Sequence, residues 1–301
     1  MSLPQPVLDT KLIHALATDR GHVRSHNEDA AAAEAGLGAY VVCDGMGGAA
    51  GGEVASRIAI DSFLRHLRST APAGLDGAGG GDAAEGLDVE QPRSGSPQAK
   101  PQSRLHAAVY AANSRVFGRS AADPKLAGMG TTLVALLHVP GPERDRRLTP
   151  RSAGLKYLPP PTLFLANVGD SRCYRLRGGE LRQISTDHSF VEEQVLAGQI
   201  TAEEAATSPM RNYITRAIGA HAHVEPDIQG YRPAAGDVYL LASDGLTREL
   251  TRAAIAAILD RQILGLTPTT SGLQMACRGL IEAAKESGGR DNITVLLLAF
   301  A

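Results

Sequence analysis

The sequence predicts an α+β fold in which antiparallel sheets and helices are segregated. Short apolar stretches bounded by glycine, proline, aspartate or asparagine are typical of strands. Longer segments repeat apolar residues with the spacing of a helix. The two kinds of segment come in groups along the chain and do not alternate strictly, which favours antiparallel sheets over a doubly wound parallel sheet.

The expected strands are short and rich in aliphatic residues. A turn-forming or helix-breaking residue bounds each of them, as is usual for strands. They cover residues 39–43, 131–139, 162–168, 238–242 and 292–300.

Two helices are expected between the first and second of these strands. Residues 103–117 carry an apolar stripe, and Ser103 is placed to cap its N-terminus. Residues 53–68 put apolar side chains at i, i+3, i+4 and i+7, namely Ile60, Phe63, Leu64 and Leu67.

Two further helices are expected before the last strand, over residues 251–264 and 271–286. Thr251 is a candidate N-cap for the first, and Gly288 is a stop signal for the second.

The middle of the chain is predicted to be irregular, with one short helix. A capping box of Thr201 and Glu204 marks the start of that helix. Two stretches are expected to be insertions. Residues 72–102 are rich in Gly, Ala, Pro and Ser, which is typical of a flexible loop. Residues 140–161 hold several prolines and an arginine cluster, and are expected to form a loop between paired strands.

The bulk composition excludes several classes of protein. The net charge is −2, from 30 basic and 32 acidic residues, which is no footprint for nucleic acid or an anionic membrane. Three widely spaced cysteines do not make a disulfide framework. The N-terminal stretch lacks the features of a signal peptide, and no apolar run approaches the roughly 20 residues that span a bilayer. These features predict a soluble, cytoplasmic protein.

Four aspartates stand at the ends of predicted strands, most of them beside a glycine. One Asp-Gly pair at a strand end is most often only a turn, but Asp44 and Asp244 lead into helices. Converging carboxylates raise each other's pKa or repel unless a cation separates them. Hard oxygen ligands without a His or Cys cluster select Mg²⁺, Mn²⁺ or Ca²⁺ over Zn²⁺. The pattern predicts a divalent-metal site built from Asp44, Asp170, Asp244 and Asp291.

Arg24 lies in a polar segment upstream of these aspartates, five residues before Asp29. An arginine on its own is most often a solvated surface charge. Beside carboxylate-held metals, however, a guanidinium can grip two phosphate oxygens while the metals take the others. Arg24 is therefore predicted to bind phosphate.

Six short motifs occur in the order typical of the PP2C (PPM) family of metal-dependent protein phosphatases, and the chain resembles the bacterial serine/threonine branch of that family. Each motif is weak alone, but six in order, between residues 18 and 298, are specific. They are Arg24-x-x-Asn27-Glu28-Asp29, Asp44-Gly45-Met46-Gly47-Gly48, Gly128-Met129-Gly130-Thr131-Thr132, Gly169-Asp170-Ser171-Arg172, Ser243-Asp244-Gly245 and Asp291-Asn292.

The resemblance implies a four-layer αββα sandwich, in which two stacked antiparallel β-sheets are flanked by helices. It implies that Asp44 bridges two metal ions and that the carbonyl of Gly45 binds one of them. Asp244 and Asp291 would complete the ligands of the other ion. Asp170, with Asp244, would hold a third, weaker metal.

The resemblance also implies a single domain spanning residues 1–301. It further implies roles for the residues around the metals. Arg24 would bind the substrate phosphate. Glu28 and Asp29 would hold metal-bound waters, with Asn292 supporting them. Residues 187–227 match the flap that covers the cleft and shapes substrate choice.

Met46 stands where eukaryotic relatives often carry a histidine that is proposed as the general acid. Methionine has no proton to donate, so the identity of the proton donor stays open. His22, His26 and His188 are the candidates in this sequence, although a lone loop histidine is more often merely exposed.

The implied function is a metal-dependent protein serine/threonine phosphatase that uses two Mn²⁺ or Mg²⁺ ions, with room for a third. Water activated by the metals would hydrolyse phosphoserine or phosphothreonine without a covalent intermediate. The implied partners are phosphorylated proteins, in particular a Hanks-type serine/threonine kinase and its substrates. A monomer is expected.

The main alternative is a PP2C-like domain that has lost catalysis and works as a regulatory or phosphoprotein-binding module. An acid at every expected metal-ligand side chain favours the enzyme. A stress-sensor phosphatase with few substrates is a second alternative within the fold. A cysteine phosphatase is excluded because no cysteine begins a Cys-x₅-Arg motif, and a nucleotide kinase is disfavoured because no glycine precedes a lysine.

Overall fold

The strands pair into two antiparallel five-stranded sheets and one short two-stranded sheet in the computed structural model, which describes residues 11–47, 51–71, 100–140, 162–263 and 268–301. Sheet 1 joins the two ends of the described chain. Its strands in spatial order are β1 (Leu12–Asp19), β12 (Ile293–Phe300), β11 (Val238–Ala242), β8 (Arg172–Arg177) and β9 (Glu180–Gln183).

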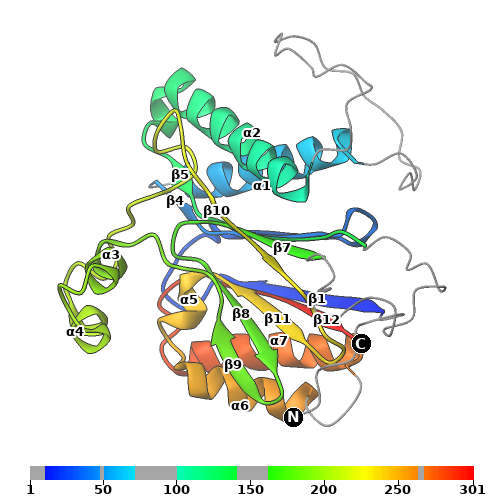
Figure 1. The fold of residues 1–301 in the computed structure, drawn as a ribbon. Helices are drawn as coiled ribbons and strands as arrows, with labels where there is room; N and C mark the ends of the chain where they lie inside the picture. The colour runs from blue at the N-terminus through cyan, green and yellow to red at the C-terminus, as the bar shows by residue number, and fades with distance from the viewer. Residues whose placement is uncertain (1–10, 48–50, 72–99, 141–161, 264–267) are drawn as a thin grey trace.

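Sheet 2 stacks on sheet 1 (Figure 1). A small pair, β4 (Gly45–Met46) with β5 (Gly130–Thr131), lies at the ends of two inner strands of sheet 2, near the first helix. The strands of sheet 2 in spatial order are β10 (Asp227–Tyr231), β7 (Leu163–Val168), β6 (Leu133–His138), β3 (Ala39–Cys43) and β2 (Ala30–Glu34).

Helices cover the outer face of each sheet, which makes four layers (Figure 1). The pair α1 (Gly51–Ser69) and α2 (Pro101–Ala122) covers sheet 2. The pair α6 (Arg252–Ile263) and α7 (Thr270–Glu286) covers sheet 1. One-turn α5 (Asp244–Thr247) follows β11 directly. The predicted αββα sandwich is thus confirmed.

Three apolar layers hold the sandwich together, and β3 shows why. Side chains alternate between the two faces of a strand. Val41 and Cys43 pack under α1 and α2, while Tyr40 and Val42 pack between the two sheets. Because both faces are buried, β3 reads as an uninterrupted apolar run. A third layer under α6 and α7 includes Leu273.

Most of the predicted elements are found close to their expected bounds. Residues 39–43 and 238–242 are β3 and β11, and residues 292–300 contain β12. Residues 131–139 form the end of β5 and all of β6, and residues 162–168 contain β7. All four long helices are present. The capping box of Thr201 and Glu204 opens α4 (Ala202–Thr207), and Thr251 accepts a hydrogen bond from the amide of Ala254.

Two predictions about the segment before α2 are wrong. The helix begins at Pro101, so Ser103 lies inside its first turn and does not cap it. The predicted insertion 72–102 therefore ends too late. Residues 72–99, like residues 141–161 of the second predicted insertion, lie outside the described residues.

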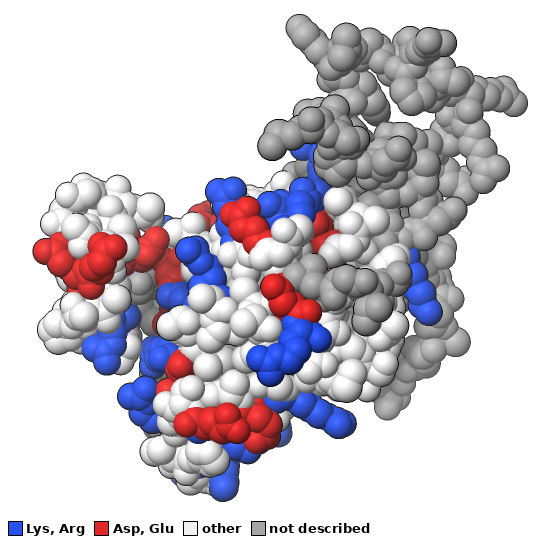
Figure 2. All heavy atoms as spheres, turned by 90° about the horizontal axis from the view of Figure 1, so that it is seen from below, with Lys and Arg blue, Asp and Glu red and all other residues white. Residues whose placement is uncertain are grey.

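The short helices α3 (Phe190–Leu196) and α4 form a lobe that projects from the sandwich within the predicted flap (Figure 1). Acidic side chains gather on this lobe, as Figure 2 shows: Glu192, Glu193, Glu203 and Glu204. Within the described part of the chain, no helix is long and apolar enough to cross a membrane.

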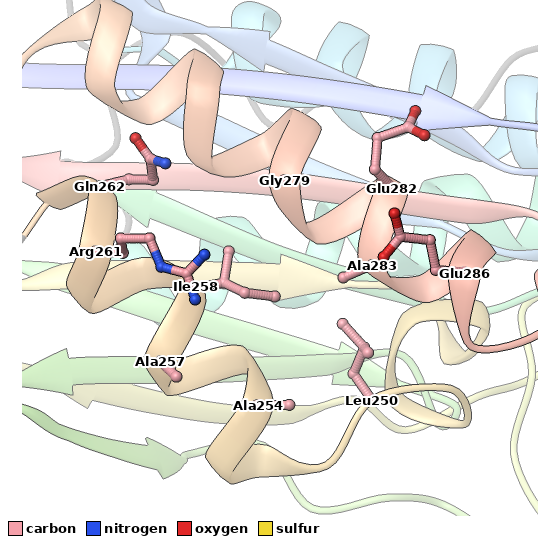
Figure 3. Close-up of a pocket in the computed structure, with 10 residues that line it drawn as sticks. All are labelled: Leu250, Ala254, Ala257, Ile258, Arg261, Gln262, Gly279, Glu282, Ala283 and Glu286. Carbon is pink, nitrogen blue, oxygen red and sulfur yellow. The ribbon is translucent and has the colours of Figure 1, made fainter.

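A hollow of about 520 Å³ lies between α6 and α7 on the outside of the molecule (Figure 3). Ala254, Ala257 and Gly279 are among the residues that line it, and their small side chains leave space between the two helices. At Gly279 a Cβ atom would lie 3.4 Å from Ile258. None of the predicted site residues lines this hollow.

Candidate metal centre

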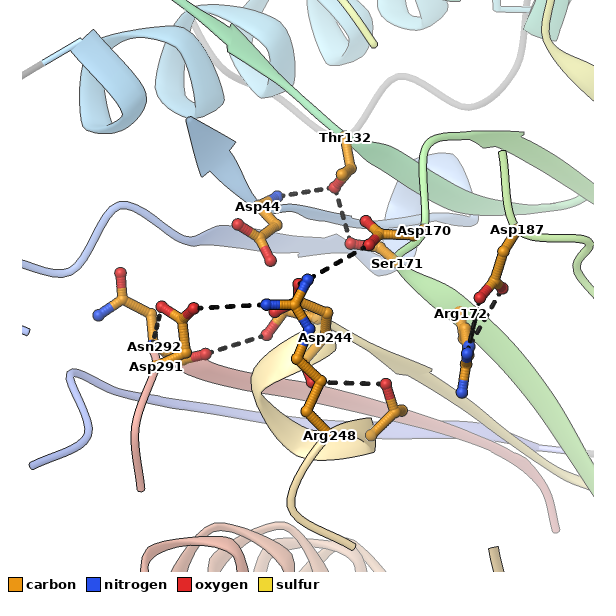
Figure 4. Close-up of polar contacts among 12 residues, drawn as sticks. Asp44, Thr132, Asp170, Ser171, Arg172, Asp187, Asp244, Arg248, Asp291 and Asn292 are labelled. Carbon is orange, nitrogen blue, oxygen red and sulfur yellow. Dashed lines mark hydrogen bonds and ion pairs between the residues drawn. The ribbon is translucent and has the colours of Figure 1, made fainter. Parts of the chain in front are cut away.

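The four strand-end aspartates meet at one end of the two stacked sheets (Figure 4). Asp44 follows β3 and Asp170 follows β7, two strands of sheet 2. Asp244 begins α5 after β11, and Asp291 precedes β12, so these two belong to neighbouring strands of sheet 1. The stacking of the sheets is therefore what brings carboxylates far apart in sequence into one cluster.

Burial and mutual repulsion both act on these carboxyl groups. Burial, followed by the charges of neighbouring aspartates, raises the pKa of Asp44 well above its usual range. The same causes raise the pKa of Asp244 to about 7. Burial also raises the pKa of Asp170, although the charge of Arg248 opposes that shift. Asp29 is buried beside them, and burial raises its pKa to about 6.

The donor set fits a hard divalent metal in its chemistry. One carboxylate oxygen of each of Asp29, Asp170 and Asp244 is buried without a hydrogen-bond partner. A buried acceptor without a partner is costly, and a cation would satisfy several such oxygens together. Across the described residues, no three His, Cys, Asp or Glu side chains are gathered tightly enough to hold an ion as they stand.

Asp44 is fixed through its backbone by the motif that precedes β6. Its amide donates to the hydroxyl of Thr132 over 2.9 Å, and its carbonyl accepts from the hydroxyl of Thr131 over 2.8 Å. The Thr132 hydroxyl also lies 2.7 Å from that of Ser171, next to Asp170. Residues 131 and 132 of the motif Gly128-Met129-Gly130-Thr131-Thr132 thus help to hold the two aspartates of sheet 2 in place.

Gly45 sits where two other backbone segments come very close. A Cβ atom at this position would lie 2.1 Å from the carbonyl oxygen of Gly52 and 2.6 Å from that of Glu28. No side chain fits there, which gives the glycine of the Asp-Gly pair a packing reason. Glu28 and the start of α1 are in this way packed against Gly45.

Asn292 ties the polar segment of residues 20–28 to β12. Its side-chain amide donates to the carbonyl oxygens of Arg20 and His26, each over 2.9 Å. Its side-chain oxygen accepts the amide of Glu28 over 2.8 Å. Three hydrogen bonds from one side chain give Asn292 a direct role in placing the segment that carries Arg24.

Asp29 is held from the sheet 1 side by Ser243. The hydroxyl of Ser243 donates to Asp29 over 2.7 Å and accepts from the amide of Thr294 over 3.0 Å. Asp29 is only 8% exposed, so it contributes a buried carboxylate to the centre in addition to the four strand-end aspartates.

Two arginines provide positive charge within the cluster. Arg24, which is half exposed, donates to Asp291 over 2.8 Å. Arg248 forms ion pairs with Asp244, Asp170 and Asp291. Arg24 was expected from the sequence, whereas Arg248 was not. Its signal was the spacing of four residues from Asp244, which places the two side chains on one face of a helical turn.

Of the candidate proton donors, His188 is buried and His22 and His26 are exposed. Nδ1 of His188 accepts the amide of Gly169, and Nε2 lies 3.3 Å from Asp227. Nδ1 therefore ties the start of the predicted flap to the end of β7, and Nε2 ties it to Asp227 at the flap's other end.

Without metal, the protein should become less stable as the pH rises from 5 to 8. Because the pKa of Asp244 is raised from 3.8 to about 7, the native state binds more protons than the unfolded state between these values. The free energy of unfolding must then fall as pH rises through this window. A pKa that differs by one between the folded and unfolded states changes this free energy by about 1.4 kcal/mol.

We therefore expect the melting temperature in EDTA to decrease from pH 5 to pH 8. Thermal unfolding at each pH measures it, with Asp244→Asn as the matched variant, for which the decrease should be smaller. A melting temperature of the parent protein that rises over this range contradicts the prediction.

Comparison with known proteins finds a matching family model and several similar proteins. A model of the protein phosphatase 2C family matches residues 18–278. The serine/threonine protein phosphatase PstP of Mycobacterium tuberculosis is 39% identical over 286 residues, which cover 95% of this chain and 44% of that protein. The chain thus spans less than half the length of this curated relative. The serine/threonine phosphatase stp of Listeria monocytogenes is 30% identical over 284 residues, 93% of each chain.

Solved structures agree in fold. The catalytic domain of PstP, crystallised in complex with two manganese ions, superposes with a TM-score of 0.70 at 35% identity. The match covers 96% of this chain and 97% of that one.

Proposed function

The chain belongs to the protein phosphatase 2C family, and from this premise we propose that it is a metal-dependent protein serine/threonine phosphatase. The observation that carries the proposal is the meeting of four strand-end aspartates, of which Asp170 and Asp244 each keep a buried oxygen without a hydrogen-bond partner. The single domain expected over residues 1–301 is part of the proposal. The names of the relatives and the manganese ions in the PstP structure support it.

We assign the metal ligands to the side chains of Asp44, Asp244, Asp291 and Asp170 and to the carbonyl of Gly45. Mn²⁺ or Mg²⁺ ions bound there would activate water and offset charge on phosphate oxygens. All four carboxylates converge on one region, which supports this assignment (Figure 4).

The residues around the proposed metal ligands would orient water and bind the substrate phosphate. Asp29, held by Ser243, and Glu28, whose amide is held by Asn292, would orient water at the edge of the centre. Arg24 would exchange its present partner Asp291 for a substrate phosphate, because a phosphate offers the same paired oxygens to its guanidinium.

Phosphorylated proteins are the proposed substrates, with a Hanks-type serine/threonine kinase and its targets as the proposed partners. The projecting α3–α4 lobe, within the flap at residues 187–227, would contact such substrates beside the phosphorylated residue (Figure 2). A monomeric state and a cytoplasmic location stay predictions.

The test is hydrolysis of a phosphothreonine peptide by the purified protein with Mn²⁺, with Mg²⁺ and with EDTA. We expect turnover with either metal and none with EDTA. If the folded protein binds Mn²⁺ and the phosphopeptide but releases no phosphate, the proposal is wrong, and the chain is a phosphoprotein-binding module.

A further inference from the structure

The guanidinium of Arg248 lies among the carboxylates that are proposed to bind metal (Figure 4). Its Nη2 atom pairs closely with Asp244 and lies 3.7 Å from Asp170, and its Nη1 atom lies 4.0 Å from Asp291. The side chain of Arg248 thus forms ion pairs with three of the four strand-end aspartates. Arg24, by comparison, forms its ion pair with Asp291.

The local fold directs Arg248 to this place. It ends the single turn of α5, and its amide donates to the carbonyl of Asp244 over 2.8 Å. That turn sets the two side chains on the same side. Asp170 reaches the same guanidinium from sheet 2 and is only 7% exposed.

Asp170 and Asp244 share Arg248 as their common positive charge. Each keeps one buried oxygen without a partner, while its second oxygen faces Arg248. Two buried carboxylates at close range need a cation between them. An arginine stays charged at every pH at which a protein folds, so it meets this need permanently. A divalent ion would have to displace it, because two cations at one carboxylate pair repel.

Resting on the proposed function, we infer that Arg248 is a built-in counter-ion of Asp170 and Asp244 that competes with divalent metal for this pair. It keeps the cluster compensated when metal is scarce. Metal enters the pair only when the Arg248 side chain moves away, and its 37% exposure leaves it a path to solvent. Metal bound at Asp170 and Asp244 is consequently weaker than metal bound at Asp44, which Arg248 does not contact in any ion pair among the described residues.

The first test uses titration calorimetry to measure the binding of Mn²⁺ to the metal-stripped protein. We expect Arg248→Ala to lower the Kd of the weakest Mn²⁺ site at least about tenfold, since a charge-assisted contact no longer opposes the ion. The matched control is Arg252→Ala, which removes the same charge four residues away. Arg252 is exposed and has no ion pair with the aspartates in the described structure. The Kd of Arg252→Ala for Mn²⁺ should therefore equal that of the parent protein.

The second test is thermal unfolding, and its expected result changes sign with metal. In EDTA, Arg248→Ala should melt below the parent protein because the carboxylates lose their counter-ion. With saturating Mn²⁺ this difference should vanish or reverse. An ordinary structural ion pair would instead lower the melting temperature equally in both conditions.

The outcomes decide whether Arg248 is a counter-ion that competes with metal or an ordinary structural ion-pair partner. An unchanged Mn²⁺ Kd in Arg248→Ala overturns the inference and leaves the proposed metal centre intact. Failure of the parent protein and all variants to bind Mn²⁺ overturns the proposed function itself. If Arg248→Ala does not fold, Arg248→Gln, which keeps part of the aliphatic stem and a polar end without the charge, is titrated in its place. If neither variant folds even with Mn²⁺, Arg248 is a structural residue and the inference is wrong.

Discussion

Replacing Asp44 by alanine is expected to reduce hydrolysis of a phosphothreonine peptide by at least about a thousandfold, which is about 4 kcal/mol of transition-state stabilisation. Asp44 lies at the centre of the cluster, where the charges of Asp29, Asp244, Asp170 and Asp291 all act on it. Asp44 lies between these other carboxylates, so none of them can replace it as a metal ligand. Initial rates with saturating Mn²⁺ measure the loss.

The same substitution should leave the metal-free fold as stable as before, or more stable. Burial and like charges both disfavour the ionised form of Asp44, so removing it relieves repulsion. The backbone of Asp44 keeps its hydrogen bonds to Thr131 and Thr132. The control is Asp61→Ala, an exposed aspartate of α1, which should change neither rate nor stability. Full activity in Asp44→Ala would mean that the metal ligands have been misassigned.

The sequence predicted the strands that are buried on both faces better than those at the sheet edges. β3, β7, β11 and β12 are continuous apolar runs because helices cover one face and the other sheet covers the second. β2 consists of four alanines and a glutamate, and alanine is not typical of strands. Its pairing with β3 therefore comes from tertiary contacts, which local composition does not reveal.

The hairpin of β8 and β9 was also missed, although its turn left a signal. Gly178 and Gly179 join the two strands, and both have positive φ. Two glycines between short alternating segments are typical of a tight hairpin. The many arginines of these strands obscured the alternation of apolar and polar residues that is typical of a strand. Arg172 and Arg177 are charged, but they pair with buried aspartates and do not face solvent freely.

The site aspartates could be predicted because each lies next to a strand end, and strand ends are readable from local sequence. Their supporting contacts could not. Ser243 and Asp29 are 214 residues apart, and Asn292 and Glu28 are 264 residues apart. Arg248 is a different case, because its spacing from Asp244 is local but only the fold shows that Asp170 and Asp291 meet the same guanidinium.

Replacing Arg24 by alanine is expected to raise the KM for a phosphothreonine peptide about ten- to a hundredfold, with a smaller change in kcat. A guanidinium bound to phosphate contributes a charge-assisted hydrogen bond worth about 1.5–3 kcal/mol, and each 1.4 kcal/mol is a tenfold change in affinity. If the guanidinium contacts the phosphate equally in the bound and transition states, the loss appears in KM. Steady-state kinetics at saturating Mn²⁺ separate the two constants.

Arg20→Ala is the matched control, because Arg20 is an exposed arginine of the same segment. Arg24→Lys should recover only part of the loss, since an ammonium cannot present the paired donors of a guanidinium. Arg24 also neutralises Asp291, so a purely structural role would change Mn²⁺ affinity and leave KM for the peptide unaffected. A raised KM with unchanged Mn²⁺ affinity assigns Arg24 to the phosphate, and the opposite pattern assigns it to the support of Asp291.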